Sequence, residues 1–259
     1  ALPIGVGKGI AEGMARKGDI IICAARNQKK GSTVQQFGFE IKSSLDETVE
    51  KIKAKDANGI AYSIDLNNQK EILELSGYIE KEFGQLDLLV HSACQIHDDF
   101  VQPKPYWEKS VDLWSLMDVG LKSNYLLSHA LTPLMIESKG KLIVQISSHG
   151  AMCYMHGPIY GAQKAGIDKM AFDMAYDLKP HEICSLSLWS GIVKDEKTQK
   201  VSEMHGEQYA EFLKGAASQE YAGLVINGLY DDPKLMTLSG KTLLAAEAGN
   251  QYGVEDIDE

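Results

Sequence analysis

The feature that most constrains the fold is a regular alternation of short apolar runs with helix-like segments along most of the 259 residues. The runs are rich in Ile, Val and Leu and lack strict alternation, as expected of strands covered on both faces. Alternation of strands with helices predicts βαβ units and a parallel sheet. Strands are predicted over residues 19–26, 59–66, 86–93, 140–147 and 182–189.

Helix signals fill the intervals between the predicted strands. The segment 67–84 begins with a capping Asn and ends at Gly84, and longer helices are predicted over residues 111–135 and 159–179. No internal repeat or Pro/Gly linker interrupts the chain, so residues 1–259 are expected to form a single α/β domain, a doubly wound parallel sheet of the Rossmann type. The strand that should precede the first glycines is missing, which we interpret as a truncated or partial sequence.

Composition limits the partners and the compartment. A net charge of −10 argues against a nucleic-acid partner, which needs a basic face. No apolar run approaches the roughly 20 residues that span a bilayer. The absence of a signal-peptide pattern favours the cytoplasm, with membrane association through missing segments left open. The widely spaced cysteines indicate free thiols in a reducing compartment: Cys23, Cys94, Cys153 and Cys184.

A glycine-rich turn opens the first predicted helix. Glycines let backbone amides approach a phosphate, and a helix N-terminus adds partial positive charge. A lone pair of glycines is weak evidence, but here the next element is a predicted strand. The residues expected to bind the phosphates of a dinucleotide are Gly5, Val6, Gly7 and Lys8.

The residue after the next strand indicates which dinucleotide binds. About 20 residues past the glycines, an acid selects the ribose hydroxyl of NAD and an arginine accommodates the 2′-phosphate of NADP. Arg26 occupies this place and no acid does, so NADP(H) is favoured over NAD(H). Asp65, at the end of the following strand, is expected either to bind the adenine amino group or to cap a helix.

Two tyrosine–lysine pairs have the spacing of one helical turn. Tyr160 and Lys164 lie in a long helical pattern and share a helix face, whereas Pro233 interrupts the pair formed by Tyr230 and Lys234. Only the first pair is therefore a candidate for proton transfer.

For the first pair to do acid–base chemistry at neutral pH, the phenolate of Tyr160 must be stabilised, because a free tyrosine has a pKa near 10. The ammonium of Lys164 and the positive charge of an oxidised nicotinamide are expected to lower the pKa of Tyr160. Ser148 follows the strand 140–147 and is expected to hold a substrate carbonyl oxygen while Tyr160 protonates it. The hydride comes from the cofactor.

The glycine-rich turn together with Ser148, Tyr160 and Lys164 resembles the short-chain dehydrogenase/reductase family. Within that family the chain most closely resembles the dehydrogenase/reductase member 1 branch, on the basis of residues 117–125, 146–166, 187–196 and 238–241. The resemblance implies an NADP(H)-dependent carbonyl reductase or alcohol dehydrogenase acting on small lipophilic substrates. It also implies a homodimer or homotetramer paired through the helices 111–135 and 159–179. Further cofactor contacts are implied for Ser92, Ala93, Tyr160, Lys164, Gly191 and Ile192.

Some family positions differ in this chain. The usual Asn-Asn-Ala-Gly after the third predicted strand reads His-Ser-Ala-Cys at residues 91–94. The helix asparagine of the catalytic tetrad falls on Gly120, with Asn124 one turn later as a possible substitute, and a threonine near the carboxamide is Asp195. These changes leave an alternative open: a catalytically weakened member that binds NADP(H) or serves as a scaffold.

Other side-chain groups suggest weaker alternatives. His91, Cys94 and His97 have a spacing that zinc ligands sometimes show, but they follow a strand into a loop, so no metal is predicted. His149 beside Ser148 lacks the G-x-S-x-G pattern of a serine hydrolase.

Two segments are candidates for the substrate side of the site. Residues 195–220 are polar and helix-like, and form either a cover over the crevice at the strand ends or a plain surface helix. Four side chains just before Tyr160 either line the substrate pocket or pack locally: Met152, Tyr154, Met155 and His156.

Overall fold

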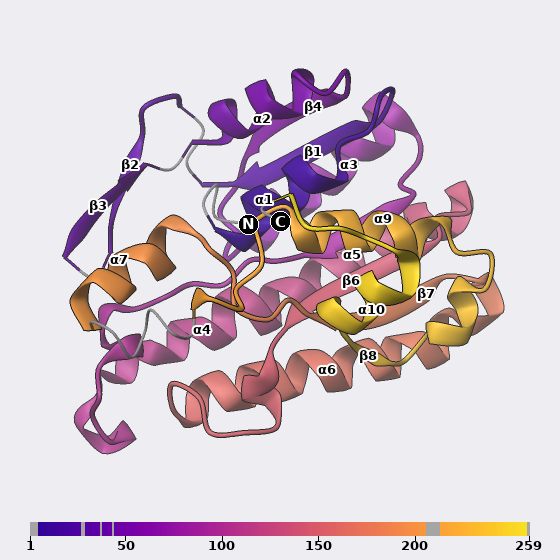
Figure 1. Ribbon diagram of the computed structural model, residues 1–259. Coiled ribbons are helices and arrows are strands. Elements are labelled where there is room, and N and C mark those ends of the chain that lie inside the picture. Colours follow the sequence, from indigo (N-terminus) through magenta and orange to yellow (C-terminus); the bar gives the residue numbers. More distant parts are fainter. Residues whose placement is uncertain (1–4, 27–28, 37, 43, 206–212, 258–259) are drawn as a thin grey trace. The chain divides into compact units, whose positions relative to one another are not determined.

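The structure is a computed structural model that describes residues 5–26, 29–36, 38–42, 44–205 and 213–257 (Figure 1). The chain divides into two compact units, and each is described by itself. The first comprises residues 1–63, 190–229 and 245–259, and the second comprises residues 64–189 and 230–244.

The sheet of the first unit is parallel and two-stranded. Strand β1 (Ile20–Ala25) pairs with β4 (Asn58–Ser63), and α2 (Leu45–Lys53) packs against both strands. Helix α2 begins where the Ser44 side chain accepts a hydrogen bond from the Glu47 amide, as an N-cap should.

An antiparallel hairpin that the sequence patterns do not predict follows β1. It consists of β2 (Thr33–Gln36) and β3 (Phe39–Lys42). Each strand has only four residues, too short for a periodic signal to distinguish it from a loop.

Glycines bring the helices of the first unit close together. A Cβ atom on Gly223 would lie 2.4 Å from the carbonyl oxygen of Ile10, and Asn227 donates a side-chain hydrogen bond to the Met14 carbonyl at 3.1 Å. Backbone therefore packs on backbone where these two helices cross. Besides α2, the described part of this unit contains α1 (Val6–Met14), α7 (Glu196–His205), α9 (Tyr221–Asp231) and α10 (Ala245–Tyr252).

The second unit contains a parallel sheet in the order β5-β6-β7-β8. Every residue of β6 is buried, as predicted for a strand covered on both faces. The strands are β5 (Leu88–His91), β6 (Leu142–Ser147), β7 (Cys184–Trp189) and β8 (Thr242–Leu244).

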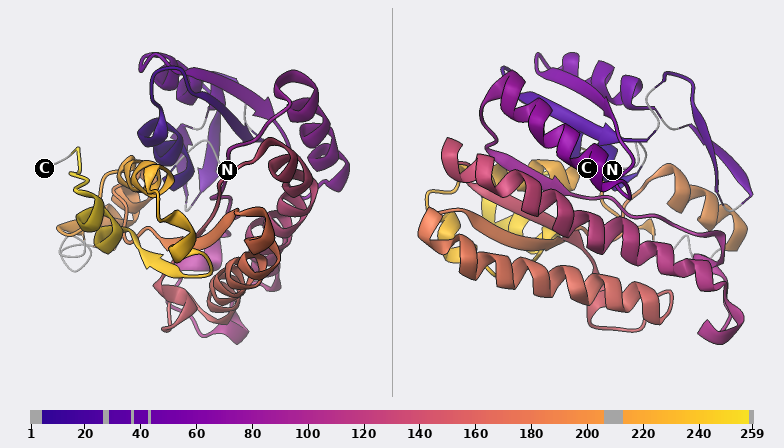
Figure 2. Two further views of the ribbon diagram at one scale, coloured as in Figure 1. Left: turned by 90° about the vertical axis from the view of Figure 1, so that its right-hand side faces the viewer. Right: turned by 180° about the vertical axis from the view of Figure 1, so that it is seen from behind.

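Three longer helices accompany this sheet. Helix α3 (Gln69–Phe83) begins at Asn68, whose side chain accepts from the Lys70 amide, and ends at Gly84 in the left-handed conformation, as predicted. Helix α5 (Ser123–Ser138) and helix α6 (Pro158–Leu178) run side by side in Figure 2. Among the described residues, no helix has the length and apolar character needed to cross a bilayer.

The prediction of one continuous helix over residues 111–135 is wrong. A 3₁₀ turn (Val111–Trp114) and α4 (Ser115–Met117) lead into a wide turn (Asp118–Lys122) before α5 starts. Gly120 has φ 144° and ψ −34°, a conformation that residues with a Cβ rarely adopt. The glycine therefore allows the helix to break at this point.

The glycine at the α1–α9 crossing predicts a stability difference. Gly223→Ala should lower the free energy of unfolding by about 1–3 kcal/mol, because its methyl group overpacks the crossing. Gly77→Ala on α3 meets no atom within 4 Å, so it should raise stability by up to about 1 kcal/mol through helix propensity. Urea unfolding of both variants measures these changes, and equal effects of the two would contradict the close packing.

Candidate active site

The site is built around a direct hydrogen bond between two hydroxyl groups. Ser148 follows the last residue of β6, and its Oγ lies 2.8 Å from the hydroxyl oxygen of Tyr160 in the first turn of α6. The same Oγ accepts a hydrogen bond from the Gly150 amide at 3.2 Å, which fixes the rotamer of the serine. A Cβ atom on Gly150 would lie 2.6 Å from the Tyr160 ring, so this glycine leaves room for the ring.

Lys164 lies one turn further along α6, on the same face as Tyr160. Its side chain is buried, with 7% of the residue exposed, and Nζ donates to the carbonyl oxygen of Ile146 at 3.3 Å. The ammonium group lies 5.5 Å from the centroid of the Tyr160 ring. The structure thus brings together all three residues that the sequence nominated for catalysis.

Burial is the largest influence on the pKa values of Tyr160 and Lys164. It raises the pKa of Tyr160 to about 12, although the hydrogen bond from Ser148 acts in the opposite direction. Burial also lowers the pKa of Lys164. The phenol is therefore the stable form of Tyr160 in the protein alone, opposite to the expected lowering. That expectation included the charge of an oxidised nicotinamide, so it concerns the cofactor-bound protein.

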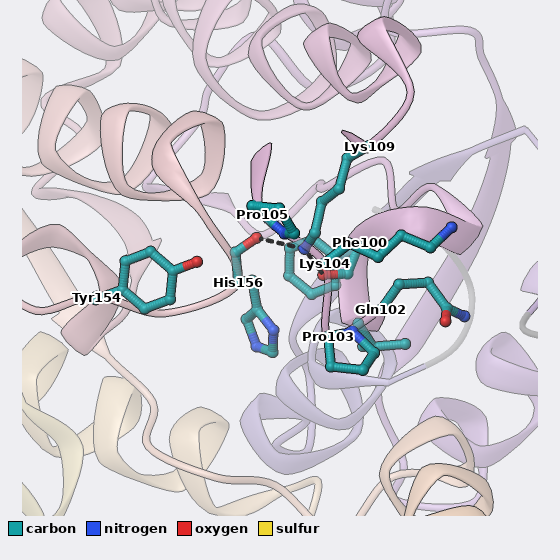
Figure 3. A pocket seen from close by; sticks show the side chains of 9 residues that line it. Phe100, Gln102, Pro103, Lys104, Pro105, Lys109, Tyr154 and His156 are labelled. Carbon is teal, nitrogen blue, oxygen red and sulfur yellow. Dashed lines mark hydrogen bonds between the residues drawn. The ribbon is translucent and has the colours of Figure 1, made fainter. Parts of the chain in front are cut away.

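A cavity of about 350 Å³ is lined by residues of the segments after β5 and after β6 (Figure 3). Lys109 braces its wall, because Nζ donates to the carbonyl oxygens of Phe100 and His156, each at 3.2 Å. These two bonds tie the segment after β5 to the segment after β6. The cavity is lined by Phe100, Val101, Gln102, Pro103, Lys104, Pro105, Lys109, Tyr154 and His156.

Two aromatic side chains connect the cavity to the tyrosine. The rings of Phe100 and His156 lie 5.1 Å and 5.3 Å from the Tyr160 ring, both edge-on. Burial lowers the pKa of His156 to about 4, so its ring is neutral at physiological pH. Of the four side chains left open between pocket and packing, Tyr154 and His156 line the cavity, whereas Met152 is 83% exposed.

The residues at the end of β5 and just after it form hydrogen bonds within the protein. His91 is buried and its Nε2 lies 2.8 Å from the Ser128 hydroxyl, while Nδ1 of His97 accepts from the Asp99 amide. Ser92 and Ala93 follow β5 and are half-buried. Within the described ranges, no three His, Cys, Asp or Glu side chains converge as metal ligands would.

The glycine-rich turn of the first unit lies next to acidic groups. Gly5 caps α1 with φ 70°, and no side chain of the described residues caps the amides of the first helical turn. Lys8 pairs with Glu196 at 3.1 Å. A Cβ atom on Gly5 would lie 2.5 Å from Oδ2 of Asp195, whose Oδ1 accepts from the Thr198 amide and caps α7.

The other residues nominated for the cofactor lie at element ends. Arg26 follows β1, is exposed, and its guanidinium has no partner among the described residues. Gly191 and Ile192 are exposed after β7. Asp65 accepts from the Asn67 amide, and the expectation that it might cap a helix is wrong, because Asn68 caps α3. The segment 195–220 contains α7, and its residues 206–212 lie outside the described part.

Sequence comparisons identify the relatives of the chain. Residues 3–206 match the model of the short chain dehydrogenase family. The human protein Dehydrogenase/reductase SDR family member 1 is 29% identical over 98% of this chain and 82% of its own length, which confirms the resemblance to that branch. A 3-oxoacyl-[acyl-carrier-protein] reductase of Buchnera aphidicola is 26% identical over 79% of this chain and 76% of its own length.

Solved structures share the fold. L-sorbose reductase from Gluconobacter frateurii, determined with NADPH and L-sorbose, superposes with a TM-score of 0.75 at 19% identity, covering 93% of this chain and 91% of that chain. A short-chain alcohol dehydrogenase from Sinorhizobium meliloti gives a TM-score of 0.77 at 19% identity, covering 94% and 91% of the two chains. These likenesses confirm the doubly wound α/β fold predicted from the alternation of strands and helices.

Burial of His91 predicts a pH dependence of stability. Burial lowers its pKa to about 3, from about 6.5 in the unfolded chain. Below about pH 6.5 the unfolded state binds a proton that the folded state excludes, so the free energy of unfolding falls as pH decreases toward 3. In His91→Gln, the free energy of unfolding should fall less steeply between pH 6 and 5, by about 1 kcal/mol per pH unit. Urea unfolding at each pH measures this slope.

His181→Gln, which changes an exposed ring, is the matched control and should leave the slope unchanged. An unchanged slope in His91→Gln would mean that His91 does not stay neutral in the folded protein.

Proposed function

Because the chain belongs to the short-chain dehydrogenase/reductase family, we propose that it is an NADP(H)-dependent oxidoreductase that interconverts a carbonyl compound and an alcohol. The observation that carries the proposal is the 2.8 Å hydrogen bond between Ser148 and Tyr160, with the Lys164 ammonium 5.5 Å from the tyrosine ring. A proton donor and a cation on consecutive turns of α6 are thereby grouped with a hydroxyl at the end of β6 that can orient a carbonyl.

In the reducing direction, each of these groups has a separate task. Ser148 donates a hydrogen bond to the carbonyl oxygen and orients it. When bound, NADPH would supply the hydride for the carbonyl carbon. Tyr160 transfers its phenolic proton to the same oxygen, which completes the alcohol, and Lys164 stabilises the phenolate that remains until solvent reprotonates it. The raised pKa of the free phenol keeps the proton in place before reaction.

The braced cavity is the proposed substrate site. Phe100 and His156 connect it to Tyr160, and Val101, Pro103 and Pro105 add apolar surface. Neutral His156 brings no charge to the wall at physiological pH. The apolar part of this lining supports ketones or aldehydes with an apolar substituent, and the amine groups of Lys104 and Lys109 line the same cavity.

The cofactor assignment rests on two features of the first unit. The first turn of α1, which no described side chain caps, offers backbone amides to a phosphate, and Arg26 at the end of β1 offers a guanidinium with no partner among the described residues. These residues fit a dinucleotide with a 2′-phosphate, so NADP(H) is proposed over NAD(H).

A weakened, cofactor-binding family member is the second candidate. Lys8 is neutralised by Glu196, and Asp195 lies against Gly5 in the turn proposed for the phosphates. Carboxylates at this place oppose the binding of an anion, which supports slow turnover or weak binding. Measured NADPH oxidation distinguishes the two candidates.

Pairing of two copies through α5 and α6 is also proposed. These helices expose Tyr125, Phe172 and Tyr176, the last with 83% of its surface accessible. Exposed aromatic side chains of this kind are enriched in protein interfaces.

The role of Tyr160 can be tested by removing only its hydroxyl. Tyr160→Phe should keep its NADPH affinity within about twofold and lose at least about 100-fold in turnover, because the proton donor is gone. NADPH oxidation with a panel of ketones, aldehydes and quinones measures the loss, and Tyr176→Phe, an exposed tyrosine on the same helix, is the control. Equal activity of Tyr160→Phe and the native protein would contradict the role of Tyr160 as the proton donor.

Arg26 gives a separate test of cofactor choice. Arg26→Ala should weaken NADPH binding by about 10- to 100-fold, the value of a hydrogen-bonded charge contact, and change NADH binding less than about twofold. Titration of NADPH and NADH fluorescence measures both dissociation constants. Arg16→Ala, which removes a cation that pairs with Asp19, controls for loss of charge. Equal weakening of both cofactors would contradict a 2′-phosphate contact.

A further inference from the structure

The break in the helix before α5 leaves backbone groups that need other partners. In a continuous α-helix the Leu116 carbonyl would accept from the amide of Gly120, four residues later. Here the Gly120 amide donates to the Ser123 hydroxyl at 3.1 Å, and the Val119 carbonyl accepts from the Gln95 amide at 3.2 Å. The Leu116 carbonyl has therefore lost its helical donor at a buried position.

A side chain from α6 replaces that donor. Gln163 is fully buried, with 0% of its surface exposed, and its Nε2 donates to the Leu116 carbonyl oxygen at 2.5 Å. The same amide lies 3.7 Å from the sulfur of Cys94, in the segment after β5. One amide thus joins three segments: the end of α4, the segment after β5 and the first turns of α6.

The amide also explains the glycine at the break. A Cβ atom on Gly120 would lie only 2.2 Å from Nε2 of Gln163. The side chain of Gln163 therefore occupies the space that any side chain at position 120 would need. The asparagine that the family pattern has at this position therefore has no room here.

Gln163 lies next to Lys164 in the chain and three residues after Tyr160. Lys164 is tied on its other side to the Ile146 carbonyl, at the end of β6. The turn of α6 that carries both groups is therefore held at two points: at the end of β6, through Lys164 and the hydroxyls of Ser147 and Ser148, and at the helix break, through Gln163. Loss of the second point lets this turn shift relative to Ser148.

We propose that Gln163 is a positioning residue that sets the placement of Tyr160 and Lys164 by anchoring their turn of α6 to the broken helix at Leu116 and Gly120. The proposal rests on the proposed reductase function for its kinetic consequences. Its structural content, the anchoring itself, does not depend on turnover.

Gln163→Met is the variant that tests it. Methionine has nearly the length and volume of glutamine but cannot donate to the Leu116 carbonyl, so the core stays filled. The matched control is Gln145→Met: Gln145 is equally buried, lies in β6, and accepts a hydrogen bond from the Asn124 amide at 2.9 Å. Both variants lose one buried amide, but only Gln163 touches the helix break.

The proposal predicts that Gln163→Met loses at least about tenfold in kcat while KM and the NADPH dissociation constant stay within about twofold. In the NADP⁺ complex, the pKa of Tyr160 should be at least half a unit higher than in the native protein. NMR of ¹³Cζ-labelled tyrosine measures that pKa, with the Tyr160 signal assigned by its loss in Tyr160→Phe. Gln145→Met should lower stability in urea and change neither quantity.

Native kcat and a native Tyr160 titration in Gln163→Met would overturn the proposal, and so would equal kinetic effects of the two variants. If the native protein bound NADPH but reduced no carbonyl, the proposed function would fail on its own. The NMR titration would still decide the role of Gln163, because it needs no turnover.

Discussion

The hydrogen bond between Ser148 and Tyr160 is the contact on which the rest of the site depends. It joins the end of β6, a strand buried along its whole length, to the first turn of α6. Because β6 cannot move without opening the core, the serine hydroxyl is a fixed reference point for the helix that carries Tyr160 and Lys164. Gly150 permits this contact, since any side chain there would collide with the tyrosine ring.

Desolvation acts on three ionisable groups around this contact and favours the neutral form of each. It raises the pKa of Tyr160 and lowers those of Lys164 and His156. A buried site of this kind holds its proton on the phenol until a charge arrives to stabilise the phenolate. Burial therefore keeps Tyr160 protonated before the reaction, and Lys164 and the cofactor are proposed to stabilise its phenolate during it.

Much of the fold follows from local signals. The limits of α3 were predicted because a capping asparagine and a left-handed glycine act within one turn of the helix. The buried strands β6 and β7 were predicted from their apolar runs. The break at Gly120 was missed, because the segment around it has the composition of a helix. The partners that sustain the break, Gln95 and Gln163, come from other elements.

The sequence by itself determined the alternation of the longer parallel strands with helices, the family, and the candidate trio of Ser148, Tyr160 and Lys164, since spacing along a helix and position at a strand end are local properties. Only the tertiary structure decided what surrounds that trio. The cavity braced by Lys109, the burial that sets the pKa values and the amide of Gln163 at the helix break all depend on contacts between residues far apart in the chain. No local pattern encodes such contacts, because they arise when separate elements pack together.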